Sequence, residues 1–175
     1  ASTVAISPAV VVEVQDASGN RVTSSSASIT IAIGANPAGG ALTGTKTVSA
    51  VSGVATFSTL SIDKAGNGYT LSATSSGLTP ASSSGFNITA GSASKLAFTV
   101  QPTSAASTVA ISPAVVVEVQ DASGNRATSS SASITIAIGN NPASGTLSGT
   151  KTVTAVAGVA TFSTLSIDKA GNGYT

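Results

Sequence analysis

The sequence predicts an all-β fold in which antiparallel strands pack in two layers, and three observations indicate it. Apolar and polar residues alternate with a period of two along several short segments. β-Branched residues dominate these segments, and glycine, asparagine, serine and proline separate them at intervals of about 8–12 residues. No segment shows a sustained 3.6-residue period, which would indicate a helix.

The first predicted strand contains three valines at alternate positions, Val10, Val12 and Val14. Successive side chains of a strand point to opposite faces, so these three share one face. Val11 and Glu13 then lie on the other face. One side of this strand is therefore expected to line a core and the other to meet water.

The same alternation predicts the remaining strands. The inward-facing sets are Ile29, Ile31 and Ile33; Phe57, Leu60 and Ile62, with a bulge between Phe57 and Leu60; Tyr69, Leu71 and Ala73; Phe86 and Ile88; and Leu96, Phe98 and Val100. Many short strands with regular turn signals are typical of antiparallel sandwiches. We therefore expect β-sandwiches of about seven strands each, with no aromatic ring at a plainly exposed position.

A turn is predicted directly after the first strand, in the stretch DASGN (16–20). The carboxylate of Asp16 can accept a hydrogen bond from the backbone two residues on, and Gly19 and Asn20 tolerate positive φ. The same stretch recurs with Asp121 in the position of Asp16. Asp16 and Asp121 are therefore predicted to be structural residues.

The chain repeats itself with an offset of 105 residues. Its first 21 residues, ASTVAISPAVVVEVQDASGNR, return unchanged at Ala106, and residues 1–70 differ from 106–175 at only seven positions. The differing pairs are 22/127, 35/140, 39/144, 41/146, 43/148, 49/154 and 52/157. Six of them fall between positions 35 and 52, which we interpret as a solvated loop and edge region.

A repeat of 105 residues has the size of a whole domain and exceeds the 20–50 residues of a solenoid unit. A spacer of small residues, Gly91 to Ser94, places the boundary near Ala93. One copy would span 1–93 without its first strand, and the next would span 94–175 without its last strands. We expect either a longer chain or neighbouring subunits that supply the missing strands.

Three motifs carry a resemblance to a known family. They are a strand ending in D-x-x-G-N, a G-V-A-T-F segment, and A-G-x-G-Y-T-L-x-A-T. Together they resemble the bacterial immunoglobulin-like repeats of invasin and intimin, over nearly all of each copy. The resemblance implies tandem immunoglobulin-like sandwiches that act as stalks of surface adhesins, and it transfers no binding residue.

The stretch IDKAGNGYTLSA also resembles the tyrosine corner of immunoglobulin-like domains. In that motif a tyrosine near the start of a late strand donates a hydrogen bond to upstream backbone. Tyr69 takes this position in the first copy and Tyr174 in the second. Both are predicted to be structural residues.

The composition excludes several kinds of chemistry. The chain has no cysteine and no histidine, so Ser-His-Asp, Cys-His and Cys/His zinc sites cannot form. Each copy holds three carboxylates, namely Glu13, Asp16 and Asp63, then Glu118, Asp121 and Asp168. A glycosidase-like pair of carboxylates is conceivable. However, Glu13 is expected to face outward on a strand and Asp16 to lie in the turn after it, so we do not favour such a pair. We expect no enzyme and no cofactor.

Two weaker candidates are a metal loop and a covalent cross-link. DKAGNG (63–68) resembles a calcium loop but lacks the middle acid, and Thr74 stands where a bidentate glutamate is needed, so a tight turn is favoured. An isopeptide bond between Lys95 and Asn87 would require both side chains in the core. The alternation points both outward.

Modification of surface residues is another possibility. Asn87-Ile-Thr89 is the only N-glycosylation sequon, and in a bacterial protein we interpret it as coincidence. The loops TSSSAS (23–28) and ASSSG (81–85) could carry O-glycans, although we favour plain solvated loops.

Only 7% of the residues are charged, the net charge is +1, and the charges form no basic stripe for nucleic acid. No apolar run reaches the ~20 residues of a membrane helix. We therefore expect an extracellular or cell-surface stalk whose partners are neighbouring copies of the same repeat. Two alternatives stay open: a filament subunit that assembles by strand donation, and a module that binds a glycan or host receptor.

Overall fold

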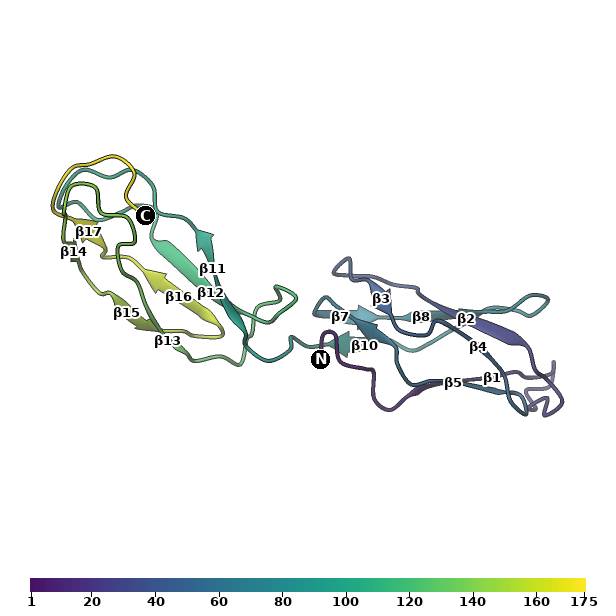
Figure 1. Ribbon diagram of the computed structural model, residues 1–175. Coiled ribbons are helices and arrows are strands. Elements are labelled where there is room, and N and C mark those ends of the chain that lie inside the picture. Colours follow the sequence, from purple (N-terminus) through teal and green to yellow (C-terminus); the bar gives the residue numbers. More distant parts are fainter. The chain divides into compact units, whose positions relative to one another are not determined.

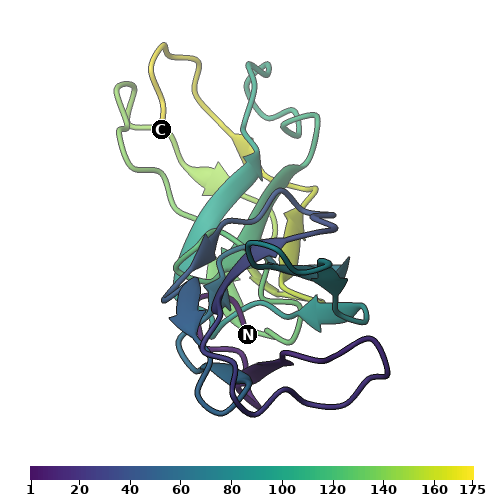
Figure 2. The ribbon, with the colours of Figure 1, turned by 90° about the vertical axis from the view of Figure 1, so that its right-hand side faces the viewer.

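The computed structural model describes residues 1–175, and every regular element in it is a strand. Neither Figure 1 nor Figure 2 shows a coiled ribbon, so the all-β prediction is confirmed. The chain divides into two units, Ala1–Gly91 and Ser92–Thr175. The division falls two residues before Ala93, within the predicted spacer of small residues.

In the first unit, one layer is a four-stranded antiparallel sheet. Its order is β4 (Thr47–Ser49), β2 (Ser28–Ile33), β8 (Leu71–Thr74) and β9 (Ala81–Ser82). The central pair places Ile33 opposite Leu71 and Ile31 opposite Ala73. Residues directly opposite each other share a face of the sheet, so these four side chains point together into the core.

The other layer contains β1 (Val10–Glu13) and β5 (Val54–Phe57). Two short pairs complete the unit: β3 (Leu42–Thr43) with β6 (Ser61–Ile62), and β7 (Gly66–Tyr69) with β10 (Phe86–Ile88). The predicted bulge between Phe57 and Leu60 is wrong, because the two residues do not belong to one continuous strand. The strand ends at Phe57, and the chain resumes at Ser61 with a different partner.

The two layers enclose a core made mainly of residues that the alternation predicts to face inward, to which Ala50 and Ala55 are added. Its buried members are Val14, Ile29, Ile31, Ala50, Ala55, Phe57, Leu60, Leu71 and Ala73. A second, smaller cluster joins Ile62, Tyr69 and Ile88. With few aromatic residues, packing in this unit depends mainly on aliphatic side chains.

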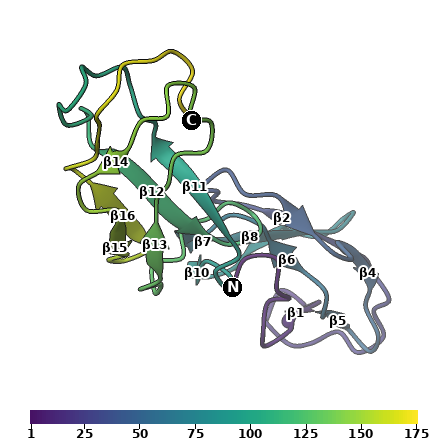
Figure 3. The same cartoon turned by 60° about the vertical axis from the view of Figure 1, so that its left-hand side comes forward.

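In the second unit, a three-stranded antiparallel sheet forms one layer, and Figure 3 shows β12 lying between its neighbours. Its order is β11 (Lys95–Val100), β12 (Val115–Gln120) and β16 (Val159–Phe162). The other pairs are β13 (Ser133–Thr135) with β15 (Thr152–Thr154), and β14 (Leu147–Ser148) with β17 (Ser166–Ile167). This unit has seven strands and the first unit has ten, whereas about seven were expected in each.

The strand order matches an immunoglobulin-like sandwich. In such sandwiches strand B lies between A and E in one sheet, and C, F and G are neighbours in the other. The order β11-β12-β16 in the second unit reproduces A-B-E, and β2-β8-β9 in the first unit reproduces C-F-G. Each unit thus displays clearly the part of the sandwich that the other lacks.

Strand β11 shows an exception to the expected burial. Leu96 lies opposite Val119 and Phe98 opposite Val117, so both belong to the core-facing side of the sheet. They are nevertheless 57% and 48% exposed, which corrects the expectation that no aromatic ring is exposed. A bulge follows Phe98 and places Val100 opposite Val116 instead of on the shared inner face.

The differences between the two copies lie mainly on the surface. All six differing positions between 35 and 52 are exposed, and so are their six counterparts in the second copy. The seventh pair is half-buried Val22 and buried Ala127. The prediction of a solvated region is therefore confirmed, and six buried core residues of the first unit have identical, buried counterparts in the second: Val14, Ile29, Ala50, Ala55, Phe57 and Leu60.

Candidate functional site

The six carboxylates of the chain do not gather into a site. No three of them, alone or with other metal-binding side chains, lie close enough together to hold a metal ion. Glu13 is exposed on β1, where its only ion pair is with Arg21 at 3.9 Å. Glu13 lies on a strand and Asp16 in the turn that follows it, as the sequence predicts.

Asp16 organises the turn after β1, as predicted. Its Oδ1 accepts hydrogen bonds from the backbone N–H groups of Ser18 and Asn20, each at 2.9 Å, and its Oδ2 accepts one from the Asn20 side chain. These bonds, those from Asn20 first, hold the pKa of the Asp16 carboxyl below its usual value. Gly19 has φ of 83°, whereas Asn20 holds the carboxylate and has no positive φ.

Asp121 forms the same turn in a different environment. Its carboxylate accepts bonds from the backbone and side-chain amides of Asn125, both at 2.9 Å. Asp121 is only 2% exposed, whereas Asp16 is exposed. Strand β11 accounts for the difference, because Lys95 at its start donates to the carbonyl of Ala122 in this turn.

Asp63 and Asp168 also bind backbone. Asp63 Oδ1 accepts from the N–H of Ala41 at 2.7 Å, and Asp168 Oδ1 accepts from the N–H of Thr146 at 2.6 Å. Each bond ties the chain after β6 or β17 to the loop that precedes β3 or β14. In the first unit the DKAGNG stretch is not a tight turn throughout, because residues 66–68 belong to β7, while its first residue, Asp63, is anchored to the loop before β3.

The predicted tyrosine corner is present in both units. The Tyr69 hydroxyl donates to the carbonyl of Lys64 at 3.0 Å, and the Tyr174 hydroxyl donates to the carbonyl of Lys169 at the same distance. Tyr69 is fully buried. Burial raises the pKa of its hydroxyl, and the charge of Asp63 raises that pKa further.

The tyrosine corner explains a glycine in each unit. A Cβ added at Gly40 would lie 2.8 Å from the Tyr69 hydroxyl oxygen and 2.7 Å from Ile62 Cγ2. At Gly145 the corresponding distance to the Tyr174 hydroxyl oxygen is 2.6 Å. Any larger residue would push the ring out of its position, so the loop before β3 or β14 requires glycine there.

The candidates for covalent chemistry lie on the surface. Lys95 and Asn87 are both exposed, as the alternation predicts, and Asn87 Oδ1 accepts a bond from the N–H of Gly68. A cross-link of the pilin kind needs a buried lysine, so this environment does not favour one. The sequon at Asn87 is exposed, and so are residues 81–85.

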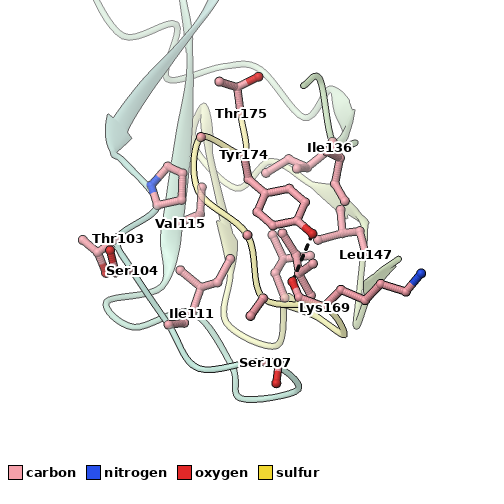
Figure 4. A pocket seen from close by; sticks show the side chains of 18 of the residues that line it. Thr103, Ser104, Ser107, Ile111, Val115, Ile136, Leu147, Lys169, Tyr174 and Thr175 are labelled. Atoms are coloured by element: carbon pink, nitrogen blue, oxygen red, sulfur yellow. Dashed lines mark hydrogen bonds between the residues drawn. The ribbon is translucent and has the colours of Figure 1, made fainter. Parts of the chain in front are cut away.

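A groove in the second unit has a volume of about 510 Å³ (Figure 4). Its apolar wall includes Phe98, Ile111, Val115, Ile136, Ile167 and Tyr174. In Figure 4 the Tyr174 ring projects toward Ile136 and Leu147 while its hydroxyl is bonded to Lys169. The groove holds Lys169 as its only charged lining residue, which favours an uncharged occupant.

The equivalent place in the first unit is filled. Ile31, Ile62 and Tyr69 are each at most 2% exposed, and in that unit β8 pairs beside β2 and β10 pairs beside β7. Their counterparts Ile136, Ile167 and Tyr174 are only partly buried. The groove therefore occupies the position that two strands take in the first unit.

Sequence reasoning did not single out this groove as a site. Alternation along single segments does not show which strands lie beside one another, so it gave no signal for the groove.

No family model, curated protein or solved structure matched the chain. The structure contains no helix that is long and apolar enough to cross a lipid bilayer.

Proposed function

We propose that the two units are spacer repeats of a stalk, which belongs to a microbial adhesin or fibre at the cell surface or outside the cell. The observation that carries this proposal is the repetition of one whole sandwich, with differences confined almost entirely to exposed positions. A repeated domain adds length without adding a new kind of site.

Separate cores support this role. The two buried clusters of the first unit lie within residues 14–88, and that of the second lies within residues 115–165. Each core is built from strands that are distant in sequence, such as β1 with β5 and β12 with β16. Pulling on a unit must therefore break several antiparallel ladders before the unit can extend.

The low number of charged residues supports a role in surroundings whose salt concentration varies. One ion pair, Arg21–Glu13, is present, and both its side chains are largely exposed. Exposed pairs of this kind contribute little stability and are screened by salt. The folding stability of a chain held mainly by apolar burial should change little with ionic strength.

Single-molecule stretching of the 175-residue chain tests the proposal. We expect two unfolding events, each lengthening the chain by about 25–30 nm, because units of 84–91 residues extend by at most about 3.5 Å per residue. Phe162→Ala should lower the unfolding force of only one event, since this ring is buried in the core of the second unit alone.

Two results would contradict a spacer role. One is extension at forces too low to resolve, which would mean that the units bear no load. The other is specific binding of the intact chain on a glycan array, which would favour a binding module. Phe98 is the ring to replace in that case, because it is the exposed aromatic residue of the chain.

A further inference from the structure

Strand β7 contains a bulge opposite the middle of β10. The register of the two strands shifts between Phe86 and Ile88. Two residues of β7, Asn67 and Gly68, therefore face the single residue Asn87. A bulge of this kind leaves its extra residue without a partner in the ladder of backbone hydrogen bonds. A backbone N–H at the bulge consequently needs an acceptor other than a strand carbonyl.

A side chain supplies that acceptor. Asn87 Oδ1 accepts a hydrogen bond from the N–H of Gly68 at 3.0 Å. Gly68 has φ of 85°, a conformation that favours glycine, and a Cβ built there would meet no atom within 4 Å. The Gly68 nitrogen is thus held by one exposed amide and has open space beside it.

The residue before Gly68 is an asparagine, Asn67, whose side chain is exposed. The backbone nitrogen of the residue that follows an asparagine can close a five-membered ring on the side-chain carbonyl carbon. A Cβ on that following residue hinders the closure, and glycine has none. Asn67 and Gly68 therefore bring together an electrophilic carbon, a nucleophilic nitrogen and access for water.

We propose that Asn67 is a modification site, where the side-chain amide is converted through a cyclic imide to a carboxylate, and that Asn87 controls the rate. The Gly68 nitrogen gives its proton to hydroxide and bonds to Asn67 Cγ. The Cγ–Nδ2 bond breaks, and ammonia leaves with a proton taken from water. Water then opens the imide. Opening at Cγ gives aspartate, whereas opening at the main-chain carbonyl gives isoaspartate.

The hydrogen bond to Asn87 opposes the first of these steps. It occupies the proton that the Gly68 nitrogen must lose, and it holds that nitrogen beside β10. Local separation of β7 from β10 removes both restraints. Asn87 also belongs to the only N-glycosylation sequon of the chain. Its contact with Gly68 gives this side chain a role that needs no glycan.

The product changes strand β7. Either product adds a negative charge, and isoaspartate also inserts a methylene group into the backbone. The inserted group disturbs the register with β10 next to Tyr69 and Ile88, which are buried together. Opening of the β7–β10 pair is thereby converted into an irreversible loss of stability of the first unit. This inference does not rest on the spacer role.

Incubation of the 175-residue chain at pH 8, followed by trypsin digestion and fragmentation mass spectrometry, tests the proposal. Trypsin releases residues 65–95 as one peptide, which contains Asn67 and Asn87 and is distinct from the matching peptide of the second unit. Digestion in heavy-oxygen water marks any conversion that occurs after the incubation. We expect the mass gain of an amide-to-acid change at Asn67 and not at Asn87, because the branched side chain of Ile88 hinders ring closure.

Three variants of the chain separate the role of the contact from general stability. Asn87→Ala removes the acceptor and should raise the rate at Asn67 about fivefold, the factor expected for one net hydrogen bond. Asn87→Asp keeps an acceptor oxygen and should leave the rate within about twofold. Ile29→Val trims the other buried cluster of the same unit and should also leave the rate within about twofold.

Three results would overturn the proposal. The first is no conversion at Asn67 in either the unmodified chain or Asn87→Ala, over a time that fully converts the free peptide AGNGYTLS. The second is equal rates in these two proteins. The third is equal acceleration by Ile29→Val, which would mean that global unfolding sets the rate. None of them affects the spacer role, because the stretching experiment does not depend on the state of Asn67.

Discussion

Residues 1–21 and 106–126 are identical, but the two units place them in different surroundings. In the second unit β11 lies beside β12, so Val115 is only 2% exposed and Asp121 is buried. In the first unit β1 pairs with β5 alone, and the counterparts Val10 and Asp16 are half-buried and exposed. In both turns the asparagine four residues on nevertheless donates from its backbone and its side chain to the aspartate.

The opposite contrast holds at the other end of the repeat. Tyr69 is buried under β10, whereas Tyr174 borders an open groove, and both hydroxyls still bond the carbonyl five residues upstream. Turn geometry therefore depends on the local sequence, while burial depends on which strands lie alongside. Each unit is a control for the other, and substitutions at equivalent positions separate the two contributions.

The largest contrast is expected at Val117 and Val12. Val117→Asp removes a carboxylate from water inside the core and should lower the free energy of unfolding of the second unit by about 4 kcal/mol or more. Val12→Asp should have a smaller effect on the first unit, because its carboxylate can reach water at the open edge of β1. Hydrogen exchange in urea measures the free energy of unfolding of each unit separately. Residues 35–52 and 140–157 tell the units apart, because the two copies differ in sequence there.

Equal losses in the two units would mean that β1 is covered in solution. Outward-facing Val11, which is 55% exposed, provides the control. Val11→Asp should change stability by less than about 0.5 kcal/mol.

A second contrast lies within the second unit, between Phe162 and Phe98. Phe162→Ala should cost about 3–5 kcal/mol, because its ring is buried in the core between the sheets. Phe98→Ala should cost less than about 1.5 kcal/mol, since half of this side chain is already in water. Chemical denaturation measures both, and a large loss at Phe98 would show that another segment covers the groove.

The tyrosine corner gives a third, smaller contrast. Tyr69→Phe removes the donor to a carbonyl beside a fully buried ring and should cost about 1–2 kcal/mol. Tyr174→Phe breaks an equally short bond that water can replace, so about 0.5 kcal/mol is expected. Equal losses in the free energy of unfolding, measured by the same exchange experiment, would mean that water reaches neither of the two tyrosine hydroxyls.

Several features of this fold could be predicted from the sequence, because they depend on periodicity and turn chemistry. The valine and isoleucine faces of β1 and β2 follow from alternation, and the aspartate turns and tyrosine corners follow from residues within five positions of each other. The surface location of the differing residues also followed from the repeat.

The features that sequence reasoning missed depend on non-local partners. Phe98 has the pattern of a core residue and is exposed, because no strand in the second unit takes the place of β8 or β10. The break after Phe57 reflects a change of partner from β1 to β3, which alternation along one segment cannot show. The groove was missed for the same reason, since its walls come from segments that are distant in sequence.

The smallest effect is expected from the pH dependence of the first aspartate turn. The pKa of Asp16 in the folded chain lies below its unfolded value of about 3.9. The ionised carboxylate therefore stabilises the first unit above pH ~4, and this contribution is lost as the pH falls through the folded pKa. Asp16→Asn should be less stable than the unmodified chain at pH 6, and the gap should narrow as the pH falls below ~4.

Thermal melts of both proteins between pH 2.5 and 6 check this expectation, with Asp63→Asn as the matched control for a carboxylate elsewhere in the same unit. The effect should be small because the Asp16 carboxylate is exposed to water. A gap that stays constant over this pH range would show that the turn needs only the oxygen acceptor of Asp16 and not its charge. In that case the local sequence sets the turn entirely through hydrogen-bond geometry.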